Sequence, residues 1–276
     1  MCYYNGVKVT KSEFIRLKSI EKIVAKYDFL NKPLHVGFDY NLAPVLKRIE
    51  GQKDFDIIQM EWGFLPTPNK WPFIKTREDA ARMRFGYKDD KGKFNTPITT
   101  LNAVSEEMLL PNKMYRDAAL NRRCLVLSTG FYEWRHVFPK NKKTGAPLKT
   151  AIKYPYRIKV KDKEYFYMAG IWNPWTDAET GEHVETFSIV TTAANSLMKQ
   201  VHNSKMRQPT ILTEDLAWEW LFGDLSEEQI TEIGKYQFPA NEMEVETIAK
   251  DFREALDPTE PCIYSEVDLP PLESIA

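Results

Sequence analysis

The chain begins Met1-Cys2-Tyr3-Tyr4, which places one of its three cysteines directly after the initiating methionine. A small residue at position 2 generally allows Met1 to be removed, and Cys2 would then carry both a free α-amine and a thiol. The reference pKa values of these two groups, about 7.7 and about 8.5, make both partly nucleophilic near neutral pH. The alternative, on position alone, is that Cys2 is a small apolar residue at the start of a strand.

Three other polar residues of reactive type lie in short, distinctive segments. Asn102 belongs to the segment LNAVSE, Glu133 to the segment GFYEW, and His202 to the segment HNSKMRQP. Each also has a structural explanation: Asn102 as a turn former, Glu133 as the exposed position of an alternating strand, and His202 as a structural group at a helix end. The residues taken singly therefore leave catalysis and structure both open.

Strands are the main elements expected to position these residues. Five segments are short, β-branched or aromatic, and bounded by Gly, Pro or Asn: residues 55–64, 123–135, 156–160, 164–172 and 184–192. Residues 161–163 are expected to form a hairpin turn, so that one sheet has an apolar and a cationic face. The pattern predicts one α+β domain over residues 1–276, with a curled, largely antiparallel, open-barrel-like sheet flanked by helices.

Helix signals are few. A capping box at residues 10–13 precedes apolar residues at helical spacing, which predicts a helix over residues 14–27. Helices are also expected at residues 193–202, at 216–222 after a Thr213 cap, and after a second capping box at 226–229. We expect mobile loops at residues 66–100 and 139–150, and a frayed end at Pro270 and Pro271.

Length and composition are those of a globular protein, with 276 residues, 43% hydrophobic and 28% charged. No apolar run reaches the length of a membrane span, and no signal-peptide pattern is present. Three scattered cysteines without a Cys-x-x-Cys pair predict free thiols, with no metal site and no cofactor. We therefore expect a cytoplasmic protein that has no membrane partner and is monomeric.

The net charge of −1 conceals an uneven distribution of charge. Residues 213–276 contain 17 acidic and 3 basic residues, which leaves +13 in residues 1–212. Ten Lys or Arg lie between Arg135 and Lys163. This division predicts a basic body that binds a polyanion and an acidic C-terminal region that does not face the same partner. The alternative is a solvated, lysine-rich hairpin that binds nothing.

Together these segments resemble the SOS-response-associated peptidase (SRAP) family, whose members process abasic sites and crosslink themselves to DNA. The matching segments occur in the family's order over roughly residues 1–221. They are the opening Met-Cys, WGFLP at 62–66, Asn102-Ala103, RRCL at 122–125, GFYEW at 130–134, AGIW at 169–172, Thr191-Thr192 and the His202 segment. Several short matches in register are far more specific than any one of them.

The resemblance implies a catalytic site made of Cys2, Asn102, Glu133 and His202. An abasic site in DNA equilibrates with a ring-opened aldehyde. After Met1 is removed, the Cys2 amine would condense with this aldehyde to an imine, and the thiol would close a five-membered thiazolidine. The family name also implies peptidase activity, with release of residues ahead of Cys2 attributed to the same site.

The other site residues have supporting roles by the same resemblance. Glu133 would move protons during imine formation, and its pKa would be raised by its neighbours Tyr132 and Trp134. His202 would donate a proton to the sugar ring oxygen, a role for a group that titrates near neutrality. Asn102 would hold the Cys2 backbone or the sugar by hydrogen bonds.

Single-stranded DNA is the expected partner, because an abasic nucleotide pairs with nothing and must be splayed into a pocket. Stacking aromatics and a cationic groove are the general solution for such DNA. We expect Trp71 and Trp134 to stack on bases, and the DNA-binding cations to be Arg122, Lys205 and Arg207.

Two departures from the family pattern concern the grip on DNA. Tyr4 and Val104 stand where the family commonly has arginines that bind phosphate, so the preferred DNA structure is left open.

Two other function classes also stay open. One is an N-terminal-nucleophile amidohydrolase in which Cys2 attacks an amide. The other is a non-catalytic module that binds single-stranded DNA.

Overall fold

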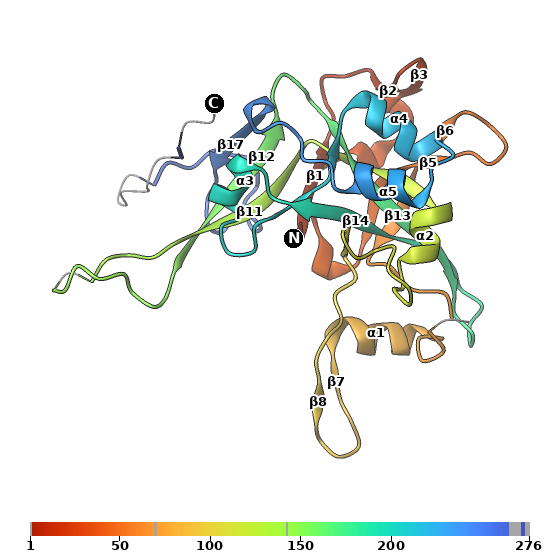
Figure 1. The fold of residues 1–276 in the computed structure, drawn as a ribbon, viewed down its shortest axis with the longest axis horizontal. Coiled ribbons are helices and arrows are strands. Elements are labelled where there is room, and N and C mark those ends of the chain that lie inside the picture. Colours follow the sequence, from red (N-terminus) through yellow and green to blue (C-terminus); the bar gives the residue numbers. More distant parts are fainter. Residues whose placement is uncertain (1, 69–70, 142, 265–271, 274–276) are drawn as a thin grey trace.

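The computed structural model describes residues 2–68, 71–141, 143–264 and 272–273. Within these residues the regular structure is mostly strand, arranged in two large sheets and two short hairpins, with a few short helices (Figure 1). The predicted mixed fold with a curled, largely antiparallel sheet is confirmed. The fraying predicted at Pro270 and Pro271 lies outside the described residues.

Five strands of the larger sheet close into a ring. They pair in the order β14-β6-β5-β10-β13, and β13 pairs again with β14. Every pairing in the ring is antiparallel except that of β14 with β6. The bounds are β5 (Leu42–Arg48), β6 (Phe55–Trp62), β10 (Arg123–Ser128), β13 (Phe166–Thr176) and β14 (His183–Ala193). Three short strands join this ring: β9 (Asn102–Val104), β15 (Arg207–Pro209) and β16 (Ile211–Leu212).

The second sheet has the order β17-β12-β11-β1-β4 and is antiparallel throughout. Its strands are β1 (Tyr4–Lys8), β4 (Asn31–Val36), β11 (Gly130–Val137), β12 (Ile152–Val160) and β17 (Met243–Thr247). The segment expected as one strand over residues 123–135 is two strands. It breaks before Gly130, whose φ of 151° suits glycine, so β10 stays in the ring while β11 enters this sheet.

The hairpin predicted at residues 161–163 is wrong. The turn there connects β12 to β13, but β12 pairs with β11 and β17, whereas β13 pairs with β10, β14 and β16. The two strands therefore belong to different sheets. A turn residue such as Asp162, with a φ of 56°, reverses the chain without determining which strands will pair.

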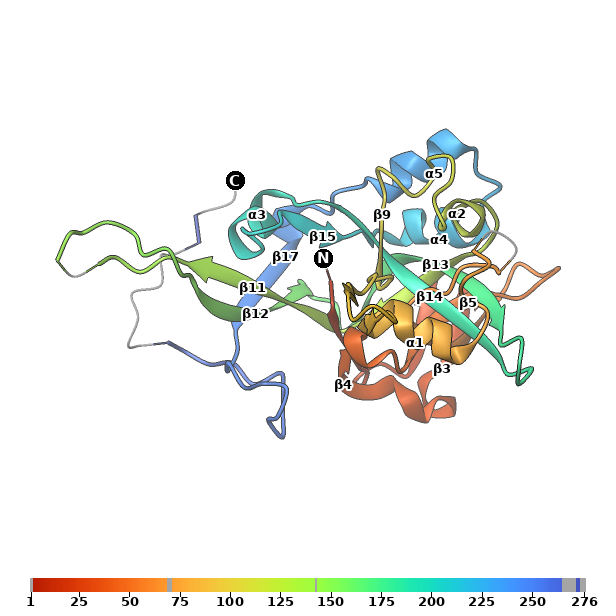
Figure 2. The ribbon, with the colours of Figure 1, turned by 90° about the horizontal axis from the view of Figure 1, so that it is seen from below.

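Two cores hold these layers together. One packs the ring against the second sheet, with Val126, Met168 and Ile189 from the ring and Phe131 and Ile158 from the sheet. The other packs the opposite face of the ring against the helices. Figure 2 shows these helices, α2 (Arg116–Asn121), α4 (Glu214–Phe222) and α5 (Glu227–Gly234), grouped away from β11 and β12.

Three of the predicted helices are present. The helix α3 (Ser196–Val201) follows β14, α4 begins after its Thr213 cap, and α5 begins at a complete capping box between Ser226 and Gln229. The segment expected as a mobile loop at residues 66–100 contains α1 (Arg77–Phe85) and a hairpin of β7 (Tyr87–Lys88) with β8 (Phe94–Asn95). No described helix is long and apolar enough to cross a membrane.

The helix predicted over residues 14–27 is wrong, because this segment forms the hairpin of β2 (Phe14–Leu17) and β3 (Ile20–Ile23), followed by 3₁₀ turns. Ile15 and Leu17 are buried while Arg16 is exposed, which is the period of two of a strand. The preceding amides of residues 10–12 donate to the carboxylate of Glu164, which lies far along the chain. A tertiary contact replaces the local capping box there.

Candidate active site

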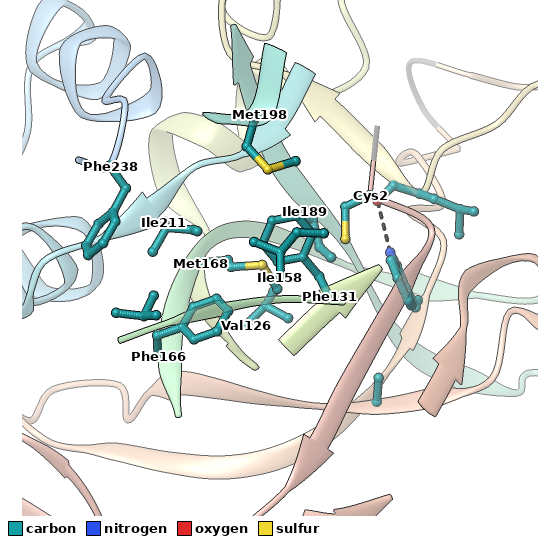
Figure 3. Close-up of a cluster of buried hydrophobic side chains, with 14 of the residues drawn as sticks. Cys2, Val126, Phe131, Ile158, Phe166, Met168, Ile189, Met198, Ile211 and Phe238 are labelled. Carbon is teal, nitrogen blue, oxygen red and sulfur yellow. Dashed lines mark hydrogen bonds between the residues drawn. The ribbon is translucent and has the colours of Figure 1, made fainter. Parts of the chain in front are cut away.

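Cys2 lies in the core between the ring and the second sheet, two residues before β1, and its side chain is fully buried. Figure 3 shows it at the edge of this cluster, beside Ile189 and Phe131. The carbonyl oxygen of Cys2 accepts a hydrogen bond from Asn102 Nδ2 at 2.9 Å. Cys2 is therefore held by a side chain that is 100 residues distant in sequence.

Asn102 is positioned by the short strand β9, which pairs in parallel with β14 so that Asn102 lies opposite Ile189. Its backbone carbonyl accepts a hydrogen bond from the hydroxyl of Tyr115 at 3.3 Å. Its side-chain Oδ1 is buried and accepts no hydrogen bond from the described residues. One end of the amide thus binds Cys2, while the other is an acceptor that a ligand hydroxyl can satisfy.

Glu133 reaches the same region from β11. Successive residues of a strand face opposite sides, so Phe131 and Glu133 face the core that contains Cys2. Tyr132 and Trp134 face the other side, where they pack with Tyr4 and Phe252. The raised pKa expected for Glu133 is therefore confirmed, but these two aromatic neighbours are not its cause. Burial on the opposite face raises it, to about 8.

His202 follows α3 and meets Glu133 across the site, with His202 Nε2 3.5 Å from Glu133 Oε2. Both side chains are buried, with relative exposures of 6% for His202 and 4% for Glu133. His202 Nδ1 lies 2.7 Å from the carbonyl oxygen of Arg207. Because a carbonyl only accepts, Nδ1 carries the proton, and Nε2 presents its lone pair to Glu133 when the imidazole is neutral.

The pair is arranged to hold one proton at neutral pH. Burial lowers the pKa of His202 to about 4, which contradicts the expectation that it titrates near neutrality. Since the pKa of Glu133 is raised and that of His202 is lowered, the carboxyl is the protonated group at neutral pH, and its Oε2 lies 3.5 Å from His202 Nε2.

The thiol of Cys2 is held in its neutral form. Burial raises its pKa, and the negative charge of ionised Glu133 raises it further. The reference pKa values predict a thiol that is partly ionised near neutral pH. In the folded chain it is neutral at that pH. It needs a base within reach, and Glu133 is the carboxyl group placed to act as one.

The arginines proposed to bind DNA have partners within the protein. Arg207 binds both carboxylate oxygens of Glu106, at 2.8 Å and 2.7 Å, while its backbone holds His202. Arg122 donates to Asn173 at 2.8 Å and pairs with Asp117. These contacts give both arginines a structural role, and that of Arg207 bears directly on the His202 imidazole. Lys205 is exposed on the loop between α3 and β15.

The aromatic residues proposed to stack on bases are half-buried. Trp134 packs edge-on against Tyr4, with ring centroids 4.9 Å apart. Tyr4 is the residue that stands where the family commonly has an arginine. Trp71 lies beside Phe73, which is 60% exposed. Sequence reasoning missed Phe73 and the similarly exposed Phe85 and Phe94 of the α1–β8 segment. Aromatics within the basic loop at residues 66–100 were the available signal.

The fold and the site define a mixed α/β protein in which a buried cysteine near the N-terminus meets an amide and a carboxyl–imidazole pair. A family model described as "SOS response associated peptidase (SRAP)" matches residues 12–254, and the chain belongs to this family. The match begins after Cys2 and continues beyond Leu221 to include β17. Among the described residues, no cluster of His, Cys, Asp or Glu has a metal-binding arrangement.

Relatives of this chain have names that refer to abasic-site processing. The chain is 30% identical over 185 residues to the "Abasic site processing protein YoqW" of Bacillus subtilis, covering 66% of each, slightly under two thirds of that protein. It is 28% identical over 257 residues to the "Abasic site processing protein HMCES" of Gallus gallus, covering 83% of this chain and 68% of that one. A solved protein from Bacteroides thetaiotaomicron aligns with a TM-score of 0.65 at 28% identity, covering 94% of this chain and 97% of that one.

Proposed function

We propose that this protein processes abasic sites in single-stranded DNA by forming a covalent thiazolidine through Cys2 once Met1 has been removed. The observation that carries the proposal is the convergence of Asn102, Glu133 and His202 on Cys2 from separate parts of the chain. The printed names of the relatives, which concern abasic-site processing, support the choice of substrate.

The reaction proceeds in two bond-forming steps. The free amine of Cys2 adds to the C1′ aldehyde of the opened sugar, and the resulting carbinolamine loses water to form an iminium ion. The thiol of Cys2 then adds to the same carbon and closes the ring, so that the net change is the loss of one water. The second step gains the high effective concentration of an intramolecular attack.

Glu133 has the protonation state that this sequence requires. The protonated carboxyl donates to the departing hydroxyl and becomes a carboxylate. The carboxylate then accepts the proton of the Cys2 thiol as sulfur attacks, which restores the acid form. A single proton thus serves both steps, and no net charge accumulates in the buried site.

His202 and Asn102 prepare the sugar for attack. A neutral His202 receives the Glu133 proton at Nε2 and passes it to the ring oxygen as the bond from C1′ to that oxygen breaks, while Arg207 keeps the imidazole oriented. The Glu133 carboxylate then takes the proton of the C1′ hydroxyl, which leaves the aldehyde and restores the acid form of Glu133. The buried Oδ1 of Asn102 accepts a hydrogen bond from a sugar hydroxyl, and its Nδ2 holds the Cys2 backbone. Trp71 and Trp134 stack on flanking bases, and Arg122, Lys205 and Arg207 contribute positive charge near the strand.

The peptidase activity in the family's name is proposed to use the same residues on the peptide bond ahead of Cys2. A precursor with one extra residue before Cys2 should then be shortened by the wild type and remain intact in Glu133→Ala. Mass spectrometry measures the length of each protein. Equal shortening of the wild type and of Glu133→Ala would assign the cleavage to another enzyme.

The test uses protein from which the loss of Met1 has been verified. This protein is incubated with an oligonucleotide that contains one abasic site. A denaturation-resistant adduct should form, with the mass of its two components less one water. The variant Cys2→Ala keeps the amine, so it should form only an imine that needs borohydride to survive denaturation. Cys262→Ala is the matched control for the removal of a cysteine, and it should react like the wild type. No adduct from the wild type would falsify the proposal.

A further inference from the structure

The hairpin of β11 and β12 extends well beyond the second sheet and carries a cluster of positive charge. We call its outer part, residues 135–153, the arm. The strands pair to Val137 opposite Ile152, and a bridge between Lys140 and Pro147 continues the hairpin. Figures 1 and 2 both show it projecting at the left, away from α2, α4 and α5. Residues 139–150, expected as a mobile loop, thus include a continuation of this hairpin, and residue 142 lies outside the described residues.

The turn at the end of the arm is also ordered by hydrogen bonds. Asn141 N donates to Ala146 O at 2.8 Å, and Gly145 N donates to Asn141 O at 2.8 Å. The side-chain oxygen of Asn141 accepts from Lys143 N at 2.8 Å. From Arg135 to this turn, seven extended residues reach roughly 23 Å.

The charged residues of the arm are all basic. Residues 135–153 contain six Lys or Arg and no Asp or Glu. Among the described residues, Lys140, Lys143, Lys149 and Lys153 are exposed and form no salt bridge. A two-stranded ribbon is marginally stable by itself, and like charges on it repel, so this charge does not serve folding.

The basic residues of β12 nearer the body, unlike the lysines of the arm, are paired with acidic residues. Arg157 pairs with Glu246 at 3.2 Å, and Lys159 pairs with Glu244 at 3.2 Å. Both glutamates belong to β17, so the acidic C-terminal strand neutralises β12 near the body. The charge left for a polyanion lies on the arm.

The base of the arm is fixed to the candidate active site. Asn203, the residue after His202, accepts from His136 N at 2.9 Å and donates to His136 O at 2.9 Å. Glu133 lies three residues earlier on β11. A DNA strand whose abasic nucleotide reaches Glu133 and His202 therefore passes the base of the arm.

We propose that the arm binds the phosphate backbone of the DNA strand that flanks the abasic nucleotide, which extends the binding surface of the proposed function. The arm is long enough to run beside several successive phosphates of one strand. Phe138 is 50% exposed on the arm and adds an aromatic surface on which an unpaired base can stack. The arm contributes affinity and site length, and it takes no part in the chemistry.

The test measures binding to an undamaged single-stranded oligonucleotide by fluorescence anisotropy between 50 and 200 mM salt, so that no covalent step contributes. The test variant changes four lysines of the arm to Gln: Lys140, Lys143, Lys149 and Lys153. Each phosphate contact contributes about 0.7 to the salt slope, so the wild type should lose about 50-fold more affinity over this range than the variant. The control changes four exposed lysines elsewhere to Gln, at the same cost in net charge: Lys11, Lys26, Lys53 and Lys235.

The outcomes separate this proposal from the one above. A reduced slope in the arm variant and an unchanged slope in the control support the arm as a DNA contact. Equal slopes in the two variants, or no binding by the wild type, would overturn it. If the slope depends on the arm but no adduct forms at an abasic site, the chemistry of Cys2 fails and the arm's binding role stands. On a short oligonucleotide that ends at the abasic site, the arm variant should crosslink at the wild-type rate.

Discussion

Replacing Glu133 with Gln tests the proton transfers on which the proposed chemistry depends. Gln has nearly the same size as Glu and can donate a hydrogen bond to His202 Nε2, but it cannot donate or accept a proton. The geometry around Cys2 should therefore persist while acid–base catalysis is lost. Loss of one such group typically costs about 10²–10⁴-fold in rate.

The pH dependence gives the sharper prediction. The Cys2 amine must be unprotonated, and its reference pKa of about 7.7 produces a rising limb of rate with pH. Glu133 must be protonated, and its pKa of about 8 produces a falling limb, because the acid form disappears as the pH rises. The wild type should show a bell-shaped profile with a maximum near pH 8, and its rate should fall about tenfold per pH unit well above that. Glu133→Gln should keep the rising limb and lose the falling one.

The assay is single-turnover crosslinking at saturating DNA between pH 6 and 10, with adducts resolved on denaturing gels. A short peptide with an N-terminal cysteine, reacted with the same abasic DNA, supplies the intrinsic pH dependence of the aldehyde and the aminothiol. The reasoning is refuted if Glu133→Gln shows the same falling limb as the wild type after this correction, or if it reacts at the wild-type rate.

Two further substitutions test how Cys2 is positioned. Asn102→Ala leaves the Cys2 carbonyl without its buried donor, which should lower the free energy of unfolding by about 1–3 kcal/mol and slow crosslinking. Urea denaturation measures the change in the free energy of unfolding. Asn102→Asp also lacks the donor and should behave like Asn102→Ala. Gly6→Ala would place a Cβ 2.5 Å from the carbonyl oxygen of Pro33 in the neighbouring strand, and such overpacking costs about 1–3 kcal/mol. A melting temperature equal to that of the wild type would contradict the second prediction.

The sequence by itself determined the local features of this protein. Caps at Thr213 and Ser226 begin helices where predicted, because a hydroxyl that accepts a hydrogen bond from an amide three residues later is a local interaction. The strand segments and the short motifs around Asn102, Glu133 and His202 were also readable, since residue type and period are properties of the sequence. They sufficed to identify the family.

Tertiary structure decided everything that depends on contacts between distant segments. The helix expected at residues 14–27 became a hairpin where Glu164 holds the preceding amides, and the segment from Arg123 divided between two sheets. The pKa values of Glu133 and His202 moved in opposite directions because both side chains are buried, and burial disfavours the charged form of each. No residue pattern contains this information, because desolvation depends on the side chains that the fold brings around a group, and those come from the whole chain.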